Sequence, residues 1–146
     1  MSKTKRELEK LEEEIMQDIF YTAVEGGIDY WCSVDWETYD SKECVAYIWE
    51  DDNGKDHRID LDVIKLGMLE LVNLYLQAEG KGWGHTQEGS DVHKLAARCN
   101  RYAIEPFAPH GIYFVDKRIV EDGEGIDATY ADIIVQHALF GDLVYG

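Results

Sequence analysis

The tetrapeptide Asp52-Asn53-Gly54-Lys55 constrains the fold more than any other segment, because it lies between two runs of strand-forming residues. Asn-Gly in this setting predicts a two-residue hairpin turn, since both residues accept the positive φ that such a turn needs. Residues 44–51 and 56–61 are therefore predicted to be antiparallel neighbours. The register that this turn fixes pairs Asp52 with Lys55, Glu50 with His57, Trp49 with Arg58, Ile48 with Ile59, Tyr47 with Asp60 and Ala46 with Leu61.

A third strand is predicted over residues 28–39, where apolar and polar side chains alternate. Because successive side chains of a strand point to opposite faces, each strand has a core side and an outer side. The core side is predicted to carry Ile28, Tyr30, Cys32, Val34, Trp36, Ala46, Ile48, Ile59 and Leu61. The outer side is predicted to carry Asp29, Trp31, Ser33, Asp35, Glu37, Tyr47, Trp49, Asp51, Asp56, Arg58 and Asp60.

Helices are predicted before and after this meander. Apolar side chains recur at spacings of three and four over residues 4–23, a helix that the glycine pair Gly26-Gly27 is expected to end by adopting a left-handed conformation. Further helices are predicted over residues 63–78 with Asp62 as N-cap, over about 91–103 with Ser90 or Asp91 as N-cap, and over about 129–140 with Gly141 as the stop.

Together these elements predict a single α+β domain over residues 1–146. It consists of an N-terminal helical segment (1–24), an antiparallel meander of three or four strands (28–61) and a helical part (62–146). About four helices are expected to pack mainly on one face of the sheet. Residues 104–126 are irregular in pattern, with one candidate strand at 112–120.

The charge of the chain is large and unevenly distributed. It has 30 acidic and 14 basic residues, a net charge of −16. Residues 11–62 hold sixteen acidic and three basic residues, net −13, whereas residues 63–102 have a net charge of +1. Direct binding to nucleic acid is not expected, because the phosphate backbone would repel such a protein.

Several features of the sequence indicate the cellular compartment. No apolar run approaches the ~18 residues of a membrane span, and the first six residues lead into charge rather than into the apolar core of a signal peptide. The three cysteines, Cys32, Cys44 and Cys99, are odd in number and widely spaced, which favours reduced thiols. A cytoplasmic location without membrane association is therefore expected.

Aromatic rings among the acidic residues of the meander suggest a binding surface. An apolar centre with a charged rim is typical of protein interfaces, and alternate strand residues lie ~6.6–6.8 Å apart, a spacing at which carboxylates can imitate phosphates. We predict that the partner is a basic host protein or a nucleic-acid-processing complex. The same acids also fit a simpler role as a solubilising face. The predicted partner-binding residues are Asp35, Glu37, Asp51, Asp56, Asp60, Trp31 and Trp49.

The glycine-rich segment 80–85 suggests an alternative, the sequestration of a nucleotide signal. It precedes a predicted helix start at Ser90, and backbone amides at such a start bind anions. The spacing of its glycines matches neither the P-loop nor the dinucleotide fingerprint. The residues that would bind a nucleotide are Lys81, Trp83, His85, Arg98 and Arg101.

Catalytic and metal-binding signatures are not evident. No two histidines have the i, i+4 spacing of a helical metal site, and no CxxC motif occurs. No catalytic residue, metal or cofactor is therefore predicted. Two other functions stay open, an assembly protein that forms homo-oligomers through the aromatic face and a metal-dependent enzyme. The enzyme would use His85, His93 or His137, with Asp127 or Asp132.

Two segments resemble parts of a known group. The stretch Glu25-Gly-Gly-Ile-Asp-Tyr-Trp31 and the end of the chain, Ala131-Asp-Ile-Ile-Val-Gln-His-Ala-Leu-Phe-Gly-Asp-Leu-Val-Tyr-Gly146, resemble an uncharacterised family of small acidic proteins from actinobacterial tailed bacteriophages. The resemblance implies a viral protein in the cytoplasm of a bacterial host. By analogy with other phage accessory proteins, it suggests a counter-defence role such as inhibition of CRISPR or restriction complexes. It assigns no functional residues.

Overall fold

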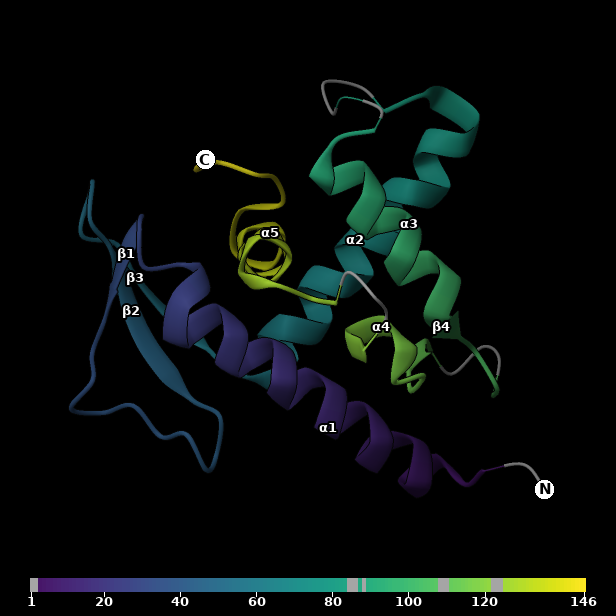
Figure 1. The fold of residues 1–146 in the computed structure, drawn as a ribbon, viewed down its shortest axis with the longest axis horizontal. Helices are drawn as coiled ribbons and strands as arrows, with labels where there is room; N and C mark the ends of the chain where they lie inside the picture. The colour runs from purple at the N-terminus through teal and green to yellow at the C-terminus, as the bar shows by residue number, and fades with distance from the viewer. Residues whose placement is uncertain (1–2, 84–86, 88, 108–110, 122–124) are drawn as a thin grey trace.

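The computed structural model describes residues 3–83, 87, 89–107, 111–121 and 125–146. It has an α+β fold, with a three-stranded antiparallel sheet in the order β1-β2-β3 and a small two-stranded sheet, as the sequence predicts. The described part of the chain contains five α-helices (Figure 1). In chain order the elements are α1 (Lys5–Thr22), a π-helical turn (Ala23–Gly27), β1 (Cys32–Val34), β2 (Ala46–Glu50), β3 (Asp56–Ile59), α2 (Leu61–Lys81), α3 (Asp91–Tyr102), β4 (Ala103–Ile104), β5 (Tyr113–Phe114), α4 (Arg118–Glu121) and α5 (Ala128–Phe140).

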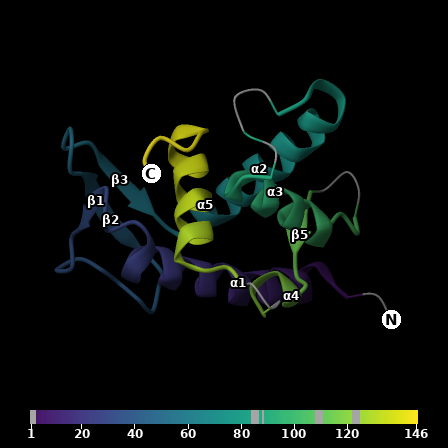
Figure 2. The same ribbon diagram turned by 45° about the horizontal axis from the view of Figure 1, so that its top comes forward.

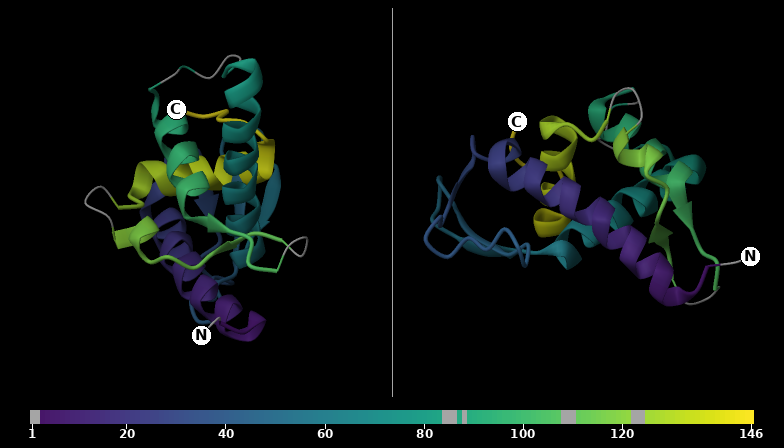
Figure 3. Two further views of the ribbon diagram at one scale, coloured as in Figure 1. Left: turned by 90° about the vertical axis from the view of Figure 1, so that its right-hand side faces the viewer. Right: turned by 60° about the horizontal axis from the view of Figure 1, so that its bottom comes forward.

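The three-stranded sheet lies at one end of the molecule, and the helices cover one of its faces. Helix α5 stands between the sheet and the pair formed by α2 and α3 (Figures 1 and 2). Helix α1 runs along the base, from the sheet end to the end where α4 and the small sheet lie (Figure 3). The core includes the inner side chains Val34, Ala46, Ile48 and Ile59 of the sheet together with α1, α2, α3 and α5.

Two glycines allow α5 to sit at the centre of the fold. A Cβ atom at Gly67 of α2 would overlap the carbonyl oxygen of Ile134, and one at Gly27 would lie 2.9 Å from the carbonyl oxygen of Ala128. Gly27 therefore serves close packing, and not the left-handed helix stop that its pairing with Gly26 predicts. The chain instead leaves α1 through the π-helical turn.

The hairpin turn is longer than the sequence predicts. Its loop spans residues 51–54, the amide of Glu50 donates to the carbonyl of Lys55 at 2.9 Å, and Gly54 alone has a positive φ of 71°. The predicted pairing is consequently wrong by two residues. Because the shift is even, the paired side chains of β2 and β3 keep their predicted faces. The observed pairs are Ala46 with Ile59, Tyr47 with Arg58, Ile48 with His57 and Trp49 with Asp56.

The first strand is much shorter than the predicted 28–39. Residues 29–31 form a turn in which the amides of Trp31 and Cys32 donate to the carbonyl of Ile28, and strand alternation holds only over Cys32–Val34. The side chains before and after the strand therefore do not follow its phase. Trp31 is buried, while Tyr30 and Trp36 are exposed, the reverse of the predicted arrangement.

The helix boundaries agree with prediction at most ends. Ser90 caps α3 and Gly141 ends α5 in a left-handed conformation, as predicted. Helix α2 begins two residues early, because the carboxylate of Asp60 and not that of Asp62 accepts from the helix start. Leu61 therefore belongs to this helix and not to β3. The candidate strand at 112–120 is reduced to Tyr113–Phe114 and is followed by α4.

Candidate binding face on the outer side of the sheet

The face of the sheet opposite the helices exposes two large aromatic side chains. Tyr47 and Trp49 project from β2 on this side and are 46% and 41% exposed, while their neighbours Ala46, Ile48 and Glu50 are buried. We call this side the outer face. Besides the two rings it carries Ser33 and Asp35 from the β1 side and Asp56 and Arg58 from β3.

The register sets the acids around the two rings. Trp49 lies between Ser33 on β1 and Asp56 on β3. Tyr47 is the next residue on the outer side of β2. Its carbonyl accepts from the amide of Asp35 at 2.9 Å, and on its other side it pairs with Arg58 of β3. The two carboxylates therefore stand at diagonally opposite corners of the aromatic pair, and the guanidinium stands at a third corner.

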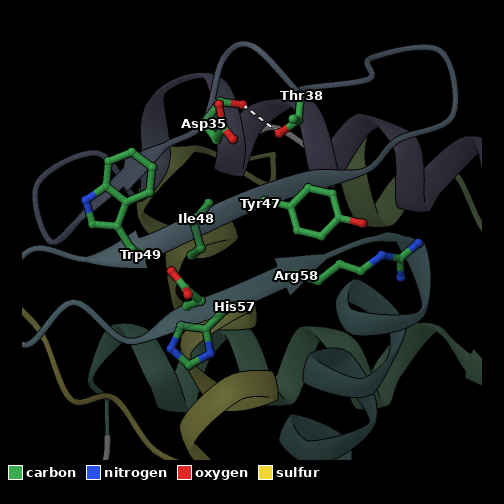
Figure 4. Close-up of a pocket in the computed structure, with 8 residues that line it drawn as sticks. Asp35, Thr38, Tyr47, Ile48, Trp49, His57 and Arg58 are labelled. Carbon is green, nitrogen blue, oxygen red and sulfur yellow. Dashed lines mark hydrogen bonds between the residues drawn. The ribbon is translucent and has the colours of Figure 1, made fainter.

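A groove runs over these rings. Figure 4 shows Tyr47 and Trp49 on the same side of β2, with Arg58 beyond Tyr47. The groove has a volume of about 580 Å³, a size at the scale of small-ligand or peptide side-chain sites. Its lining residues are Asp35, Thr38, Tyr47, Ile48, Trp49, Asp56, His57 and Arg58.

Local hydrogen bonds order the groove. The hydroxyl of Thr38 donates to the backbone carbonyl of Asp35 at 3.4 Å, and the carboxylate of Asp35 accepts from the amide of Glu37 at 3.2 Å. The guanidinium of Arg58 contacts the Asp60 carboxylate, and the neighbouring Tyr47 hydroxyl together with Asp60 raises the pKa of Arg58. The cation of the groove is thus engaged within the protein.

Most of the predicted partner-binding residues lie on or beside this face. Asp35, Asp56 and Trp49 line the groove, and Asp51 joins them through a 2.6 Å hydrogen bond that it accepts from the hydroxyl of Ser33. Glu37 is exposed in the turn after β1. Asp60 contacts Arg58 but also caps α2, so its carboxylate has a structural role.

Trp31 is the exception, because it belongs to the interior. Its side chain is 3% exposed, and its indole N–H donates to Asp132 on α5 at 2.8 Å. The second carboxylate oxygen of Asp132 accepts from the hydroxyl of Tyr30 at 2.5 Å, and the amide of Gln136 donates to the first at 2.9 Å. The side chain of Tyr30 as a whole is exposed, but desolvation of its hydroxyl and the hydrogen bond to Asp132 raise the pKa of Tyr30 to about 12. The prediction that Trp31 is available to a partner is wrong.

The end of the chain seals this interior site. The ring of Tyr145 stacks on Trp31 with the ring centroids 5.1 Å apart and an interplanar angle of 4°. The side-chain oxygen of Gln136 accepts from the amides of Val144 and Tyr145 at 2.9 and 2.7 Å. We call residues 142–146, held in this way, the C-terminal clasp.

Glu50 anchors the clasp to the sheet from the inner side of β2. Its carboxylate accepts from the hydroxyl of Tyr145 at 2.6 Å and lies 2.8 Å from the imidazole Nε2 of His57. These contacts lower the pKa of Glu50, and the bond to Glu50 raises the pKa of Tyr145 to about 12. Sequence reasoning missed this role of Glu50. The i, i+4 pair Asp132 and Gln136 in an otherwise apolar helix is the signal that indicates such a buried polar network.

The residues of the alternative nucleotide site do not form one site in the described structure. Trp83 contacts His93 at the start of α3, with ring centroids 4.4 Å apart. Arg98 is buried, donates to the carbonyl of Gly125 at 2.6 Å and lies over the ring of Tyr130. Arg101 is exposed near the other end of α3, over the ring of Tyr102, and Lys81 is exposed at the end of α2. His85 lies outside the described residues.

The residues considered for catalysis have structural contacts. Within the described ranges, no group of three or more His, Cys, Asp or Glu side chains is placed to hold a metal ion. His93 accepts from the amide of Gly89, and Asp127 caps α5 by accepting from the amide of Tyr130. His137 is buried in α5.

The three cysteines are buried and form no disulfide. Burial raises the pKa of Cys32 and of Cys99 to about 12. Since the thiolate is the reactive form of a cysteine, these two side chains are poor nucleophiles in this fold.

Comparison of the chain with protein-family models, with curated proteins and with solved structures gave no match. Among the described residues, no helix combines the length and the apolar character that crossing a bilayer requires. The function is therefore argued from the outer face itself.

Proposed function

We propose that the protein is an acidic binding protein that inhibits a nucleic-acid-directed complex by occupying its basic surface. The observation that carries the proposal is the outer face, where Tyr47 and Trp49 are exposed between Asp35 and Asp56 while the helices cover only the opposite side of the sheet. Exposed aromatic side chains with a charged rim are the usual energetic centre of a protein interface.

The distribution of charge supports a basic partner. Residues 11–62, which include the C-terminal two thirds of α1 and the whole three-stranded sheet, have a net charge of −13, so this part of the molecule carries most of its negative potential. Such a field attracts a basic surface over a distance of several ångströms and accelerates encounter at low salt. The same field disfavours direct binding to nucleic acid. The protein would therefore compete with nucleic acid for the basic surface of the partner and would not bind the nucleic acid itself.

The setting of this function is the cytoplasm of a bacterial host. The resemblance of residues 25–31 and 131–146 to phage proteins suggests that the inhibited complex is a host defence system of the CRISPR or restriction type. Inhibition by occupation of a surface needs no cofactor and no catalytic residue. The proposed partner is a protein complex with a basic channel or groove that normally holds a nucleic-acid backbone.

The test compares a variant of the outer face with a charge-matched control. The face variant carries Asp35→Lys, Asp51→Lys and Asp56→Lys. The control carries Glu9→Lys, Glu13→Lys and Glu79→Lys, three exposed acids of the helices, so both variants change the net charge by the same amount. Displacement of labelled duplex DNA from a panel of purified bacterial restriction and CRISPR effector complexes is followed by fluorescence anisotropy.

We expect the native protein and the helix control to displace DNA from at least one complex, and the face variant to fail. Equal displacement by the face variant contradicts the proposal, and so does the absence of displacement from every complex in the panel. Circular dichroism of the three proteins shows whether each is folded.

A further inference from the structure

The turn after β1 holds the most exposed tryptophan of the protein. Trp36 is 61% exposed, against 41% for Trp49 and 3% for Trp31, although the alternation of residues 28–39 predicts it on the core side. Tryptophan is enriched among the residues that contribute most to the binding energy of protein interfaces. Trp36 is therefore a candidate contact point, and it does not line the groove over Tyr47 and Trp49.

The orientation of this indole is fixed by the ring of Tyr39. The two rings are stacked, with centroids 5.1 Å apart and an interplanar angle of 25°. The ring of Tyr39 in turn contacts the buried ring of Phe20 with centroids 6.2 Å apart, and its hydroxyl donates to the carboxylate of Glu25 at 2.8 Å. The exposed indole thus rests on a ring that the core and a hydrogen bond hold in place. We call the rings of Trp36 and Tyr39 the Trp36 stack.

The backbone of this turn is also held by hydrogen bonds. The carboxylate of Asp35 accepts from the amide of Glu37 at 3.2 Å, and its carbonyl accepts from the amide of Thr38 at 3.3 Å. Asp40 and Val45 exchange two backbone hydrogen bonds of 3.0 Å, which close the loop at its other end. A side chain on such a base loses little conformational entropy when a partner binds it.

One face of the indole is available to a partner. Within the described part of the chain, Tyr39 is the one aromatic ring in contact with Trp36. A planar side chain that is covered on one face keeps the other in water, in agreement with its exposed fraction of 61%. Residues 35–43 contain four acidic residues and one lysine, a net charge of −3. A cation that approaches the free face therefore meets both the negative face of the ring and a negative field.

We propose that the free face of Trp36 receives an arginine side chain of the basic partner. Guanidinium is planar and stacks on aromatic rings, and its N–H groups can donate to the carboxylate of Glu37, the exposed neighbour of Trp36. The ammonium group of lysine has no plane to stack and is more strongly hydrated. A nucleobase also stacks on indole, but its phosphates would be repelled by the acidic turn. The inference rests on the proposed function and names a chemical group that the protein recognises.

The Trp36 stack adjoins the groove of the outer face. Asp35 and Thr38 line that groove, and Figure 4 shows the hydrogen bond that joins them at its rim. Trp36 lies between these two residues in the same turn. A partner seated on Tyr47 and Trp49 therefore extends over the turn to reach the indole, which adds a contact at the rim of the same surface.

The test titrates hexa-arginine and hexa-lysine, two peptides of equal length and charge, into the full chain at low salt by calorimetry. A cation over an exposed indole gains about two- to fivefold in affinity. We expect the native protein to prefer hexa-arginine, and Trp36→Leu to lower the affinity for hexa-arginine about two- to fivefold and the affinity for hexa-lysine by less. Trp36→Phe, which keeps an aromatic face, should lie between the native protein and Trp36→Leu.

The matched control is Trp49→Leu, which removes the exposed indole of the groove and leaves the Trp36 stack intact. Loss of the arginine preference in Trp49→Leu but not in Trp36→Leu overturns the proposal. A Trp36→Phe variant as weak as Trp36→Leu also overturns it, because stacking would then not explain the loss. Circular dichroism of each variant shows whether it is folded.

The outcomes separate this inference from the proposed function. Equal affinity of the native protein for the two peptides overturns the arginine contact at Trp36. It leaves the proposed function in place, since that function is judged by the displacement of DNA. An arginine preference that depends on Trp36, together with no displacement of DNA from any complex, contradicts the proposed function alone.

Discussion

The two sides of β2 carry the same kinds of residue and use them in opposite ways. On the inner side, Glu50 and the nearby Trp31 and Tyr145 form a closed network in which the carboxylate and the indole N–H have hydrogen-bond partners. On the outer side, Tyr47 and Trp49 stand exposed in a groove between carboxylates. Residue type alone does not distinguish the two sides. The distinction is whether the groups already have partners within the chain.

This comparison predicts that inner substitutions change stability and that outer substitutions change binding. The largest effect is expected for Asp132→Ala, which leaves the buried indole N–H of Trp31 without its acceptor and removes a partner from Tyr30 and Gln136. Unpartnered buried groups cost about 1–3 kcal/mol each, so we expect a loss of about 3 kcal/mol in the free energy of unfolding, measured with urea. An effect no larger than that of Asp56→Ala would contradict the closed inner network.

The stability of the protein is also expected to depend on pH through Glu50 on the inner side of β2. Because hydrogen bonds from Tyr145 and His57 lower the pKa of Glu50, its carboxylate contributes stability above the usual carboxyl pKa of ~4.3 and loses it as the pH falls through the lowered value. Glu50→Gln should therefore destabilise the protein at pH 7, and the difference from the native protein should shrink as the pH falls below the usual carboxyl pKa toward the lowered pKa of Glu50. Thermal unfolding at several pH values measures this, and a pH-independent difference would argue against the role of Glu50.

A smaller effect is expected from Tyr145→Phe, which keeps the stack on Trp31 but removes the hydroxyl that donates to Glu50. Hydrogen bonding to Glu50 raises the pKa of Tyr145 to about 12, so its contribution is present below pH ~10 and is lost as the pH rises toward 12. The variant should be less stable than the native protein at pH 8, with a narrowing difference above pH 10. Tyr145→Ala, which also loses the stack, is the control that must be more destabilised.

The smallest effect on stability is expected on the outer side. Asp56→Ala removes an exposed side chain, so the free energy of unfolding should change by less than about 0.5 kcal/mol, whereas Trp49→Ala also loses the packing of an indole that is only 41% exposed and should cost more than Asp56→Ala but less than Asp132→Ala. Urea denaturation tests this directly. A loss comparable to that of Asp132→Ala would show that these residues are part of the folding core, and the comparison between the two sides would fail.

Sequence pattern predicted the faces of the hairpin well, because alternation is a local property. Ala46, Ile48 and Ile59 point inward and Tyr47 and Trp49 outward, as predicted, even though the turn shifts the pairing by two residues. The shift escaped prediction because it depends on how the turn closes. A four-residue loop with one positive φ competes there with the two-residue turn that Asn-Gly favours.

The placement of Trp31 could not be predicted in the same way. Its burial depends on Asp132 and Tyr145, which are more than a hundred residues away along the chain, and on the π-helical turn that ends at Gly27. The start of α5 packs against this turn, where a Cβ atom at Gly27 would lie 2.9 Å from the carbonyl oxygen of Ala128. The alternation of side chains within residues 28–39 carries no information about contacts with such distant residues. Asp35, Asp56 and Trp49 lie on the outer side as predicted, because the alternation of a regular strand sets the side of each.

The anchoring of β2 has a consequence for the kinetics of any complex formed on its outer face. Because Glu50 fixes the strand from behind through Tyr145 and His57, the rings of Tyr47 and Trp49 stand on a base that need not rearrange when a partner arrives. Little ordering entropy is then lost on association, and the encounter rate is set by diffusion and ionic strength. Differences in affinity among partners should accordingly reside in how long each complex persists.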